Sequence, residues 1–469
     1  MNDAAFWGRK HQAQTMNVSL LEYFRCPEQF TELGINGNLS AEPGFFQFGR
    51  GITCYGKCSV SAPSPDVVRV CPDVSDGVRF EGGRLDLPFD FTQTVDNLRE
   101  ERYMSRLGFW QPGAPSGRAI KAVYYFLRPF LPVPVRKHLQ RTRLRGWEKI
   151  PFPHWPVDFT VDSLMESVLA LALKCHKIDR VPFIWFWPNG APACTMMTHD
   201  VEGESGRAFC SELMDLDDTF GIKSSFQIVP EDRYKSNQDF LHSLRSRGFE
   251  INVHDLNHDG FLFGGREDFL KRSVLINKHA KEFGAEGFRS GAMYRNQSWY
   301  DSFDFSYDMS VPNVAHLEPQ RGGCCTVMPY FIGRILELPL TTTQDYSLFH
   351  ILGDYSIDLW KKQIELIVQR HGLLSFITHP DYLIEKRAQG IYSELLSYLA
   401  RLRTEKYLWS ALPSQINRWW RNRQQMRLVQ DGNRWRIEGP DCTRARIAYA
   451  SLKGNRIDYS MDAESEPNS

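Results

Sequence analysis

The sequence has no excess of charge of either sign. Its 56 Lys and Arg residues balance 56 Asp and Glu residues over 469 positions, so the formal net charge at pH 7 is zero. Proteins that bind nucleic acid through its phosphates present clustered positive charge. The balance therefore argues against nucleic acid as the main partner of this chain.

Long apolar runs are also missing. No stretch of about 18 uninterrupted apolar residues occurs, which is the length that a membrane-spanning helix needs. The segment Met1–Gln14 is polar and charged, and it lacks the apolar core of a secretory signal. We therefore expect a cytoplasmic protein without a membrane span.

Cysteines are present, but not in a pattern that indicates disulfides or a metal cluster. The ten cysteines are scattered, which is typical of reduced thiols. Cys54 and Cys58 have a spacing that can hold a metal, but no second pair with a matching spacing accompanies them. Free thiols are the expected state.

The composition divides the chain into four regions. Residues 1–115 are rich in Gly and Pro, with short apolar runs that predict strands and turns. Residues 116–155 join an aromatic stretch to a basic one, typical either of a segment that touches a membrane surface or acidic partner, or of a helical hairpin packed on the main domain. Residues 156–412 alternate strands and helices, and residues 413–469 predict a small β module with a disordered acidic tail.

The region 156–412 carries the clearest secondary-structure signal. Strands are predicted at Ala193–Met197, Ser224–Ile228, Phe249–Val253, Gly287–Arg289, Arg334–Leu338 and Leu373–Ile377. Helices are predicted at Ser205–Phe220, Ser236–Arg247, Arg266–Phe283 and Ile357–His371. Each helical pattern ends just before a glycine, which favours the left-handed conformation of a helix terminus. Alternation of this kind predicts an α/β fold with a parallel sheet or barrel.

Two carboxylates follow the first of these strands. Asp200 and Glu202 are separated by one residue in Thr198-His-Asp-Val-Glu202. One of them can accept a proton while the other binds a metal. Alone, such a pair is also typical of a solvated loop or a helix start.

Three further strand ends carry reactive side chains. His254 and His258 follow one strand, and a helical turn there would place both imidazoles on one face, where they can share a metal. Arg289 can hold a carboxylate in its ionised form, and His379 can act as a general acid. A surface arginine and a structural histidine are the alternatives. Because parallel α/β folds place their sites at the carboxyl ends of strands, we expect these side chains to converge.

Together these residue types indicate hydrolysis of an acyl bond. A divalent metal held by two imidazoles and a carboxylate keeps positions open for water and substrate. A neighbouring carboxylate takes a proton from the water, and a protonated histidine delivers one to the leaving amine or alkoxide. The sequence thus predicts a metal-dependent hydrolase.

In order and strand placement, these sites resemble the motifs of the polysaccharide deacetylase family, the NodB-homology domains of carbohydrate esterases. The resemblance covers Ala193–Leu412, about half of the chain, and its most specific part is the pair His254-x-x-x-His258. It implies a distorted (β/α) barrel of about seven strands.

The resemblance also implies catalytic roles. Asp200 matches the catalytic base, Arg289 matches the arginine that orients this base, and His379 matches the catalytic acid. The segment Leu338–Asp345 lies where the family's fourth motif falls, and Asp345 is counted with the catalytic residues.

The metal ligands follow from the same resemblance. Val201 occupies the position of the customary metal-binding Asp, so Glu202 is the expected third ligand beside His254 and His258. The implied metal is divalent: zinc, with cobalt or nickel as the other candidates.

An acetylated sugar or polysaccharide precursor is the substrate that the resemblance implies, within glycan or exopolysaccharide metabolism. Two alternatives remain: hydrolysis of a C–N bond in a small non-sugar amide, and a non-catalytic relative that binds or assembles glycans. Peripheral contact with the inner face of a membrane through residues 116–155 is a further hypothesis. The sequence does not predict the oligomeric state.

Two other segments hold polar and aromatic side chains whose role the sequence leaves open. The stretch Ser306–Gln344 carries polar residues that could line a substrate groove or belong to a long structured loop: Asp308, Asn313, His316, Glu318 and Arg321. The segment Arg418–Arg421 includes two tryptophans that could stack on sugars or pack against the barrel.

Overall fold

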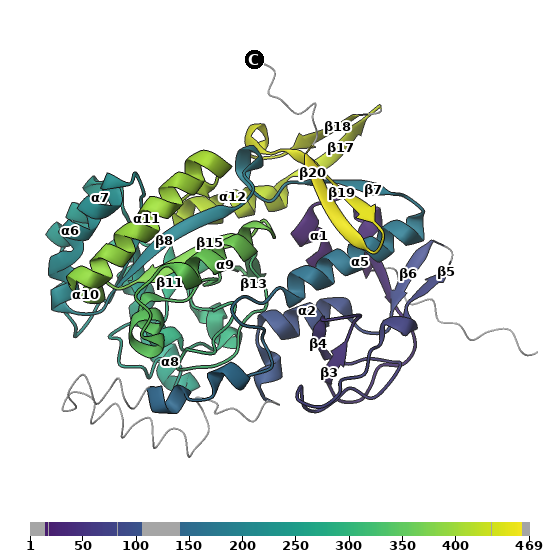
Figure 1. The fold of residues 1–469 in the computed structure, drawn as a ribbon, viewed down its shortest axis with the longest axis horizontal. Coiled ribbons are helices and arrows are strands. Elements are labelled where there is room, and N and C mark those ends of the chain that lie inside the picture. Colours follow the sequence, from purple (N-terminus) through teal and green to yellow (C-terminus); the bar gives the residue numbers. More distant parts are fainter. Residues whose placement is uncertain (1–14, 17, 82, 106–140, 433, 462–469) are drawn as a thin grey trace, which may run out of the picture.

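The fold is that of a computed structural model, which describes residues 15–16, 18–81, 83–105, 141–432 and 434–461 (Figure 1). Most of the segment for which membrane contact is predicted, residues 116–140, lies outside the described residues. The greater part of the predicted acidic tail, residues 462–469, lies outside them as well.

A largely parallel sheet forms the centre of the molecule. Its strands run in the order β13-β14-β12-β11-β10-β9-β8-β15, and β16 also pairs with β8. Every neighbouring pair is parallel except β13 with β14. The strands are β8 Cys194–Val201, β9 Ser225–Ile228, β10 Glu250–His254, β11 Gly287–Arg289, β12 Tyr307–Asp308, β13 Tyr330–Ile332, β14 Ile335–Glu337, β15 Leu373–Thr378 and β16 Trp409–Ser410.

Helices follow the strands of this sheet in the chain, with α6, α7 and α11 gathered on the left in Figure 1. Local signals define their ends: the Asn237 side chain accepts a hydrogen bond from the Phe240 amide before α7, and Gly284 has a φ of 56° after α8. The predicted α/β class is confirmed, and the arrangement fits a distorted (β/α) barrel. The helices are α6 Glu204–Thr219, α7 Gln238–Ser246, α8 Arg266–Phe283, α9 Asp358–Val368, α10 Pro380–Leu383 and α11 Lys386–Lys406.

Strand β8 continues beyond the predicted end at Met197 to Val201. Polar residues remain inside it because each has a buried partner. The two ring nitrogens of His199 lie 2.8 Å from Thr378 Oγ1 and 2.9 Å from Asp217 Oδ2. Asp200 therefore belongs to the strand itself and not to the loop that follows it.

The N-terminal region combines two small β structures with helices, on the right in Figure 1. One is a sheet of order β1-β2-β6-β5, and the other is the hairpin β3–β4. Helix α5 packs against α2 and β6 of this region and also against β20 near the C-terminus. The elements are β1 Thr15–Met16, α1 Val18–Phe24, β2 Glu32–Ile35, β3 Gly44–Gln47, β4 Thr53–Gly56, β5 Arg79–Glu81, β6 Arg84–Leu87, α2 Phe91–Arg99 and α5 Thr160–His176.

The C-terminal elements fold back onto the rest of the chain. Strand β19 pairs antiparallel with β20 on one side and with β7 on the other, although β7 lies in the region 156–412. Trp419 and Trp420 of α12 are almost fully buried, which favours packing over sugar stacking for both. The division into four regions stays a prediction. The elements are β7 Arg180–Ile184, α12 Pro413–Gln425, β17 Arg427–Asp431, β18 Arg434–Glu438, β19 Ile447–Lys453 and β20 Arg456–Met461.

One buried arginine joins helix α12 to α1 and to the end of β7. The side chain of Arg423 in α12 is fully buried. Its Nη2 donates to the carbonyls of Tyr23 (2.9 Å) and Ile184 (2.7 Å), and its Nε donates to that of Trp185 (3.0 Å). Burial and the neighbouring Arg25 lower the pKa of Arg423 to about 9.

We expect Arg423→Ala to lower the free energy of unfolding by about 3 kcal/mol or more, because several buried carbonyls lose their donor at about 1–3 kcal/mol each. Urea unfolding of the full chain measures this change. The matched control is Arg418→Ala, an exposed position of the same helix, where a change within about 0.5 kcal/mol is expected. A loss at Arg423 no larger than at Arg418 would contradict the prediction.

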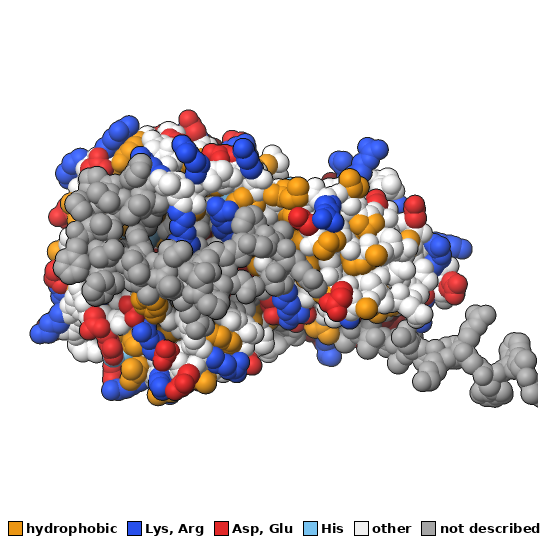
Figure 2. Space-filling view, turned by 90° about the horizontal axis from the view of Figure 1, so that it is seen from below, with side chains coloured by type: hydrophobic (Ala, Val, Ile, Leu, Met, Phe, Trp, Pro, Cys, Tyr) orange, Lys and Arg blue, Asp and Glu red, His pale blue; other side chains and the backbone are white. Residues whose placement is uncertain are grey.

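No helix among the described residues has the length and apolar character to cross a bilayer. On the face drawn in Figure 2, acidic and basic side chains are interspersed over the described surface, in keeping with the balanced charge of the sequence.

Candidate metal centre and catalytic site

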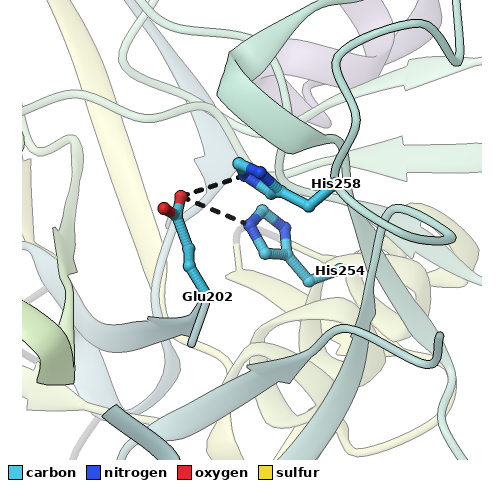
Figure 3. A group of neighbouring side chains, drawn as sticks. All are labelled: Glu202, His254 and His258. Carbon is cyan, nitrogen blue, oxygen red and sulfur yellow. Dashed lines mark ion pairs between the residues drawn. The ribbon is translucent and has the colours of Figure 1, made fainter. Parts of the chain in front are cut away.

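Three side chains converge at the carboxyl end of the sheet: Glu202, His254 and His258 (Figure 3). Their candidate ligand atoms all lie within 4.8 Å of one another. The Glu202 Oε1 atom is 2.9 Å from His258 Nε2 and 4.0 Å from His254 Nε2. Both histidines are buried, and the glutamate is mostly buried.

The strands bring this group together through their alternation and register. Thr198, Asp200 and Glu202 stand at every second position, so they share one face of β8 and its continuation. His254 is the last residue of β10 and pairs in register with Arg289, the last residue of β11. The carboxyl ends of β8, β10 and β11 thus face one site, although β9 lies between β8 and β10 in the sheet.

The segment from His254 to His258 does not form the helical turn that would place both imidazoles on one helix face. Asp255 and His258 have φ values of 59° and 53°, which are left-handed and interrupt any helix. Asp255 stabilises the loop, since its Oδ1 accepts from the Leu256 amide and its Oδ2 from the Gly291 amide. A Cβ at Gly291 would lie 2.5 Å from Asp255 Oδ2, so the close approach requires glycine there.

The free ring nitrogens fit a metal. His254 Nε2 is buried without a hydrogen bond to any described residue, and His258 Nε2 faces only the carboxylate of Glu202 at 2.9 Å, an arrangement that a shared cation would stabilise. His254 Nδ1 lies 3.2 Å from the Arg289 carbonyl, an arrangement that keeps the proton on Nδ1 and directs the Nε2 lone pair at the site. Two imidazoles and one carboxylate are the ligand set of catalytic zinc sites, which retain an open position.

Asp200 lies beside this group with its two oxygens in different surroundings. Arg289 Nη1 donates to Asp200 Oδ1 (2.7 Å) and to Thr198 Oγ1 (2.7 Å). The other oxygen, Oδ2, is 3.8 Å from His254 Nε2. Burial alone would raise the pKa of Asp200, but the charge of Arg289 and of two nearby histidines outweighs it and lowers the pKa. Asp200 is therefore an ionised carboxylate with one oxygen available to the site.

His379 lies on another side of Glu202, with Nε2 3.6 Å from Glu202 Oε1. Its Nδ1 donates to Asp345 Oδ1 (2.6 Å), and its backbone amide donates to Asp345 Oδ2 (2.7 Å). Burial lowers the pKa of His379, but the charge and hydrogen bond of Asp345 outweigh it and raise the pKa to about 10. A protonated imidazole therefore presents Nε2 to the site at neutral pH.

The structure brings together every site residue predicted from the sequence, since each lies within 4.0 Å of another member of the group. Sequence reasoning missed two contributors. The Thr198 hydroxyl accepts from Arg289, and its position two residues before Asp200 could have indicated it. Arg233 donates from Nε to the Glu202 carbonyl at 2.9 Å, and no sequence signal marks it.

Half of the chain is similar in structure to polysaccharide deacetylases. A structure described as a polysaccharide deacetylase from Mycobacterium smegmatis matches 51% of this chain and 93% of its own, with 18% identity and a TM-score of 0.42. One so described from Pseudomonas aeruginosa PAO1 matches 50% and 92%, with 14% identity and a TM-score of 0.41. The allantoinase Puue matches 50% and 92%, with 12% identity and a TM-score of 0.42. No family model and no curated protein matches the sequence.

Proposed function

We propose that this chain is a metal-dependent hydrolase that removes acetyl groups from an acetylated sugar or polysaccharide precursor. The observation that carries the proposal is the pairing of an ionised Asp200 and a protonated His379 around one candidate metal group. Acyl hydrolysis needs both a proton acceptor and a proton donor at the same bond.

The metal that we propose is zinc, held by Glu202, His254 and His258. When bound, a divalent metal polarises the acyl oxygen and lowers the pKa of water. The chain's own residues supply the proton transfers and the orientation of the groups that make them.

Asp200 is the proposed base. Arg289 holds its Oδ1, so its Oδ2 is the oxygen that accepts a proton from the attacking water. Because Arg289 also keeps the carboxylate ionised, the base is ready at neutral pH.

His379 is the proposed acid, and Asp345 is its positioning residue. His379 donates a proton from Nε2 to the leaving amine or alkoxide, while its Nδ1 stays bonded to Asp345. Arg289 acts through Asp200 in the same way, so it is also a positioning residue.

The test is acetate release from a panel of N- and O-acetylated sugars and oligosaccharides by zinc-loaded protein. We expect release from at least one of them, loss of release with a chelator, and recovery with zinc. Hydrolysis confined to small cyclic or linear amides would favour a C–N hydrolase instead. Zinc binding with no hydrolysis of any compound would favour a non-catalytic protein. The cytoplasmic location and the contact with a membrane stay predictions.

The pair of His379 and Asp345 predicts a specific pH dependence. The acid must be protonated, so activity is lost as pH rises through the pKa of His379, which lies at about 10. Asp345→Asn removes the largest influence that raises this pKa, and we expect the alkaline limb of kcat to move down by about 1–3 pH units. Initial rates across pH 5–11 measure the shift.

The matched control for this shift is Asp358→Asn, an exposed position at the start of α9, which should leave the limb in place. Asp345→Glu should restore part of the wild-type profile, because it keeps the charge. An alkaline limb that Asp345→Asn does not move would contradict the assignment of His379 as the acid.

A further inference from the structure

A buried network of hydrogen bonds lies behind the proposed site, on the opposite face of β8 and β15. His199 and Thr378 are register partners in these two parallel strands. Their side chains point away from the site, because successive side chains along a strand alternate between its two faces. The next position in each chain segment carries the proposed base, Asp200, and the proposed acid, His379. The network therefore joins the two strands directly beside both groups.

His199 is the centre of this network. Its Nδ1 lies 2.8 Å from Thr378 Oγ1, and its Nε2 lies 2.9 Å from Asp217 Oδ2. The Asp217 carboxylate also accepts from Ser224 Oγ and from the Tyr392 hydroxyl, both at 2.6 Å. In the neutral imidazole, Nε2 therefore donates to Asp217, and Nδ1 accepts from the Thr378 hydroxyl. The network ties β8 and β15 to helices α6 and α11, and all five of its side chains are fully buried.

The acid depends on this link more than the base does. Strand β15 is the last in the sheet order, so β8 is its only sheet partner among the described residues. His379 lies one residue beyond β15, and its backbone amide donates to Asp345 instead of to a strand. Asp200, in contrast, lies inside β8, is in register with Gln227 of β9 and is held by Arg289. Loss of the link should therefore displace the acid and leave the base in place.

The ring of His199 is also fixed by packing. Its centroid lies 4.9 Å from that of Phe226 and 5.9 Å from that of Tyr392, with the latter pair edge to face. A buried network in which every member has its partners is rigid, and it gives each group one position. Turnover is sensitive to such positions, because a displacement of about 1 Å can lower a rate about 10²-fold.

We propose that His199 and Thr378 are positioning residues of the reaction, which hold the end of β15 so that His379 presents its proton to the leaving atom. Asp217 fixes the ring of His199 from the other side. This role rests on the proposed function. It gives the buried polar residues behind the sheet a part in turnover in addition to their part in stability.

The kinetic test compares two substrates that differ in their need for an acid, on zinc-loaded full-length protein. The amine that leaves the trisaccharide of N-acetylglucosamine must take up a proton, whereas 4-nitrophenyl acetate releases a stable anion. We expect Thr378→Val to lower kcat for the trisaccharide about three- to tenfold and to leave its KM within about twofold. The value of kcat/KM for 4-nitrophenyl acetate should stay within about twofold. Equal losses on both substrates, or none on the trisaccharide, would overturn the proposal.

Further variants separate positioning from stability. Thr378→Ser keeps the hydroxyl and should restore the wild-type kcat to within about twofold. Thr378→Val added to His379→Gln should lower turnover no further than His379→Gln alone, because no acid remains to be positioned. An additional loss in the double variant would contradict the role. The matched control is Thr31→Val, which removes another fully buried hydroxyl, one that donates to the Glu28 carbonyl at 2.7 Å, and it should change neither rate.

A measurement without turnover separates failure of the positioning from failure of the proposed function. The Nδ1 proton of His379 lies in a hydrogen bond of 2.6 Å to Asp345, and such short bonds move a proton resonance downfield. Magnetic resonance of protein with isotope-labelled histidine records this signal, which His379→Gln assigns by its loss.

We expect Thr378→Val to shift or broaden the signal of His379, while Thr378→Ser and Thr31→Val leave it in place. A signal that Thr378→Val does not change would overturn the positioning, whatever the wild type hydrolyses. A changed signal in a protein that hydrolyses neither substrate would refute the proposed function but support the position that His199 and Thr378 give to His379.

Discussion

Asp200→Asn should reduce kcat for acetate release by about 10²–10⁴-fold, the range expected when a general base is lost. The asparagine can still accept a hydrogen bond from Arg289, but it cannot take a proton at Oδ2. Because Asp200 is not among the proposed ligands, the zinc content should stay that of the wild type. Acetate release and bound zinc, measured on the same preparation, test both statements.

The matched control for the base is Asp215→Asn, which removes a carboxylate from the exposed surface of α6. It should leave kcat within about twofold of wild type, because removal of an exposed charge far from the site has little effect on the protein. Unchanged kcat in Asp200→Asn with zinc bound would refute the assignment of the base. A loss of zinc together with activity would instead make Asp200 a ligand.

The second large effect is expected on the affinity for zinc when one proposed ligand is removed. We expect His258→Ala to weaken zinc binding by more than about 10²-fold, because even loss of an outer-shell partner costs about 10–100-fold. Glu202→Gln should weaken it as well, since a neutral amide is a poor substitute for a carboxylate ligand. Equilibrium dialysis against zinc measures both without reference to activity.

The control for the ligand is His242→Ala, which removes an exposed histidine of α7 and should leave zinc binding unchanged. Zinc should also raise the thermal midpoint of the wild type, because a ligand that binds only the folded state stabilises it, and this rise should be smaller in His258→Ala. If neither His258→Ala nor Glu202→Gln lowers the affinity for zinc, the proposed metal centre is wrong.

The two effects together distinguish the hypotheses that the sequence leaves open. A catalytic protein loses turnover but keeps zinc in Asp200→Asn, and it loses both in His258→Ala. A non-catalytic glycan-binding protein shows the zinc effects without any turnover. The choice between a sugar and a small amide then depends on the substrate panel.

Much of the local structure was predictable because local signals and tertiary packing agree. Helix α8 spans the predicted residues Arg266–Phe283, and Gly284 ends it with positive φ. The predicted strands lie within a few residues of β8, β9, β10, β11, β14 and β15. The apolar runs that mark the strands and the glycines that end the helices are local features of the sequence. They can therefore be recognised without knowledge of the tertiary structure.

The strand predicted from the sequence is shorter than β8 at its carboxyl end, and the difference arises from tertiary contacts. Polar residues at positions 199 and 200 indicate a strand end, but both are buried in the folded protein. His199 contacts Asp217 and Thr378, and Asp200 contacts Arg289, all from other elements. No local pattern reveals such partners, since they lie 18 or more positions away in the chain.

By itself, the sequence determined the alternation of strands and helices and which reactive side chains end the strands. Their convergence followed from a general rule, because parallel strands place their carboxyl ends at one edge. Only the tertiary structure decided the geometry of the candidate metal group. His258 reaches Glu202 from a left-handed loop that Gly291 and Asp255 stabilise, and Arg289 leaves one oxygen of Asp200 available. These arrangements depend on contacts between elements far apart in the sequence, and no spacing of residues along the chain encodes them.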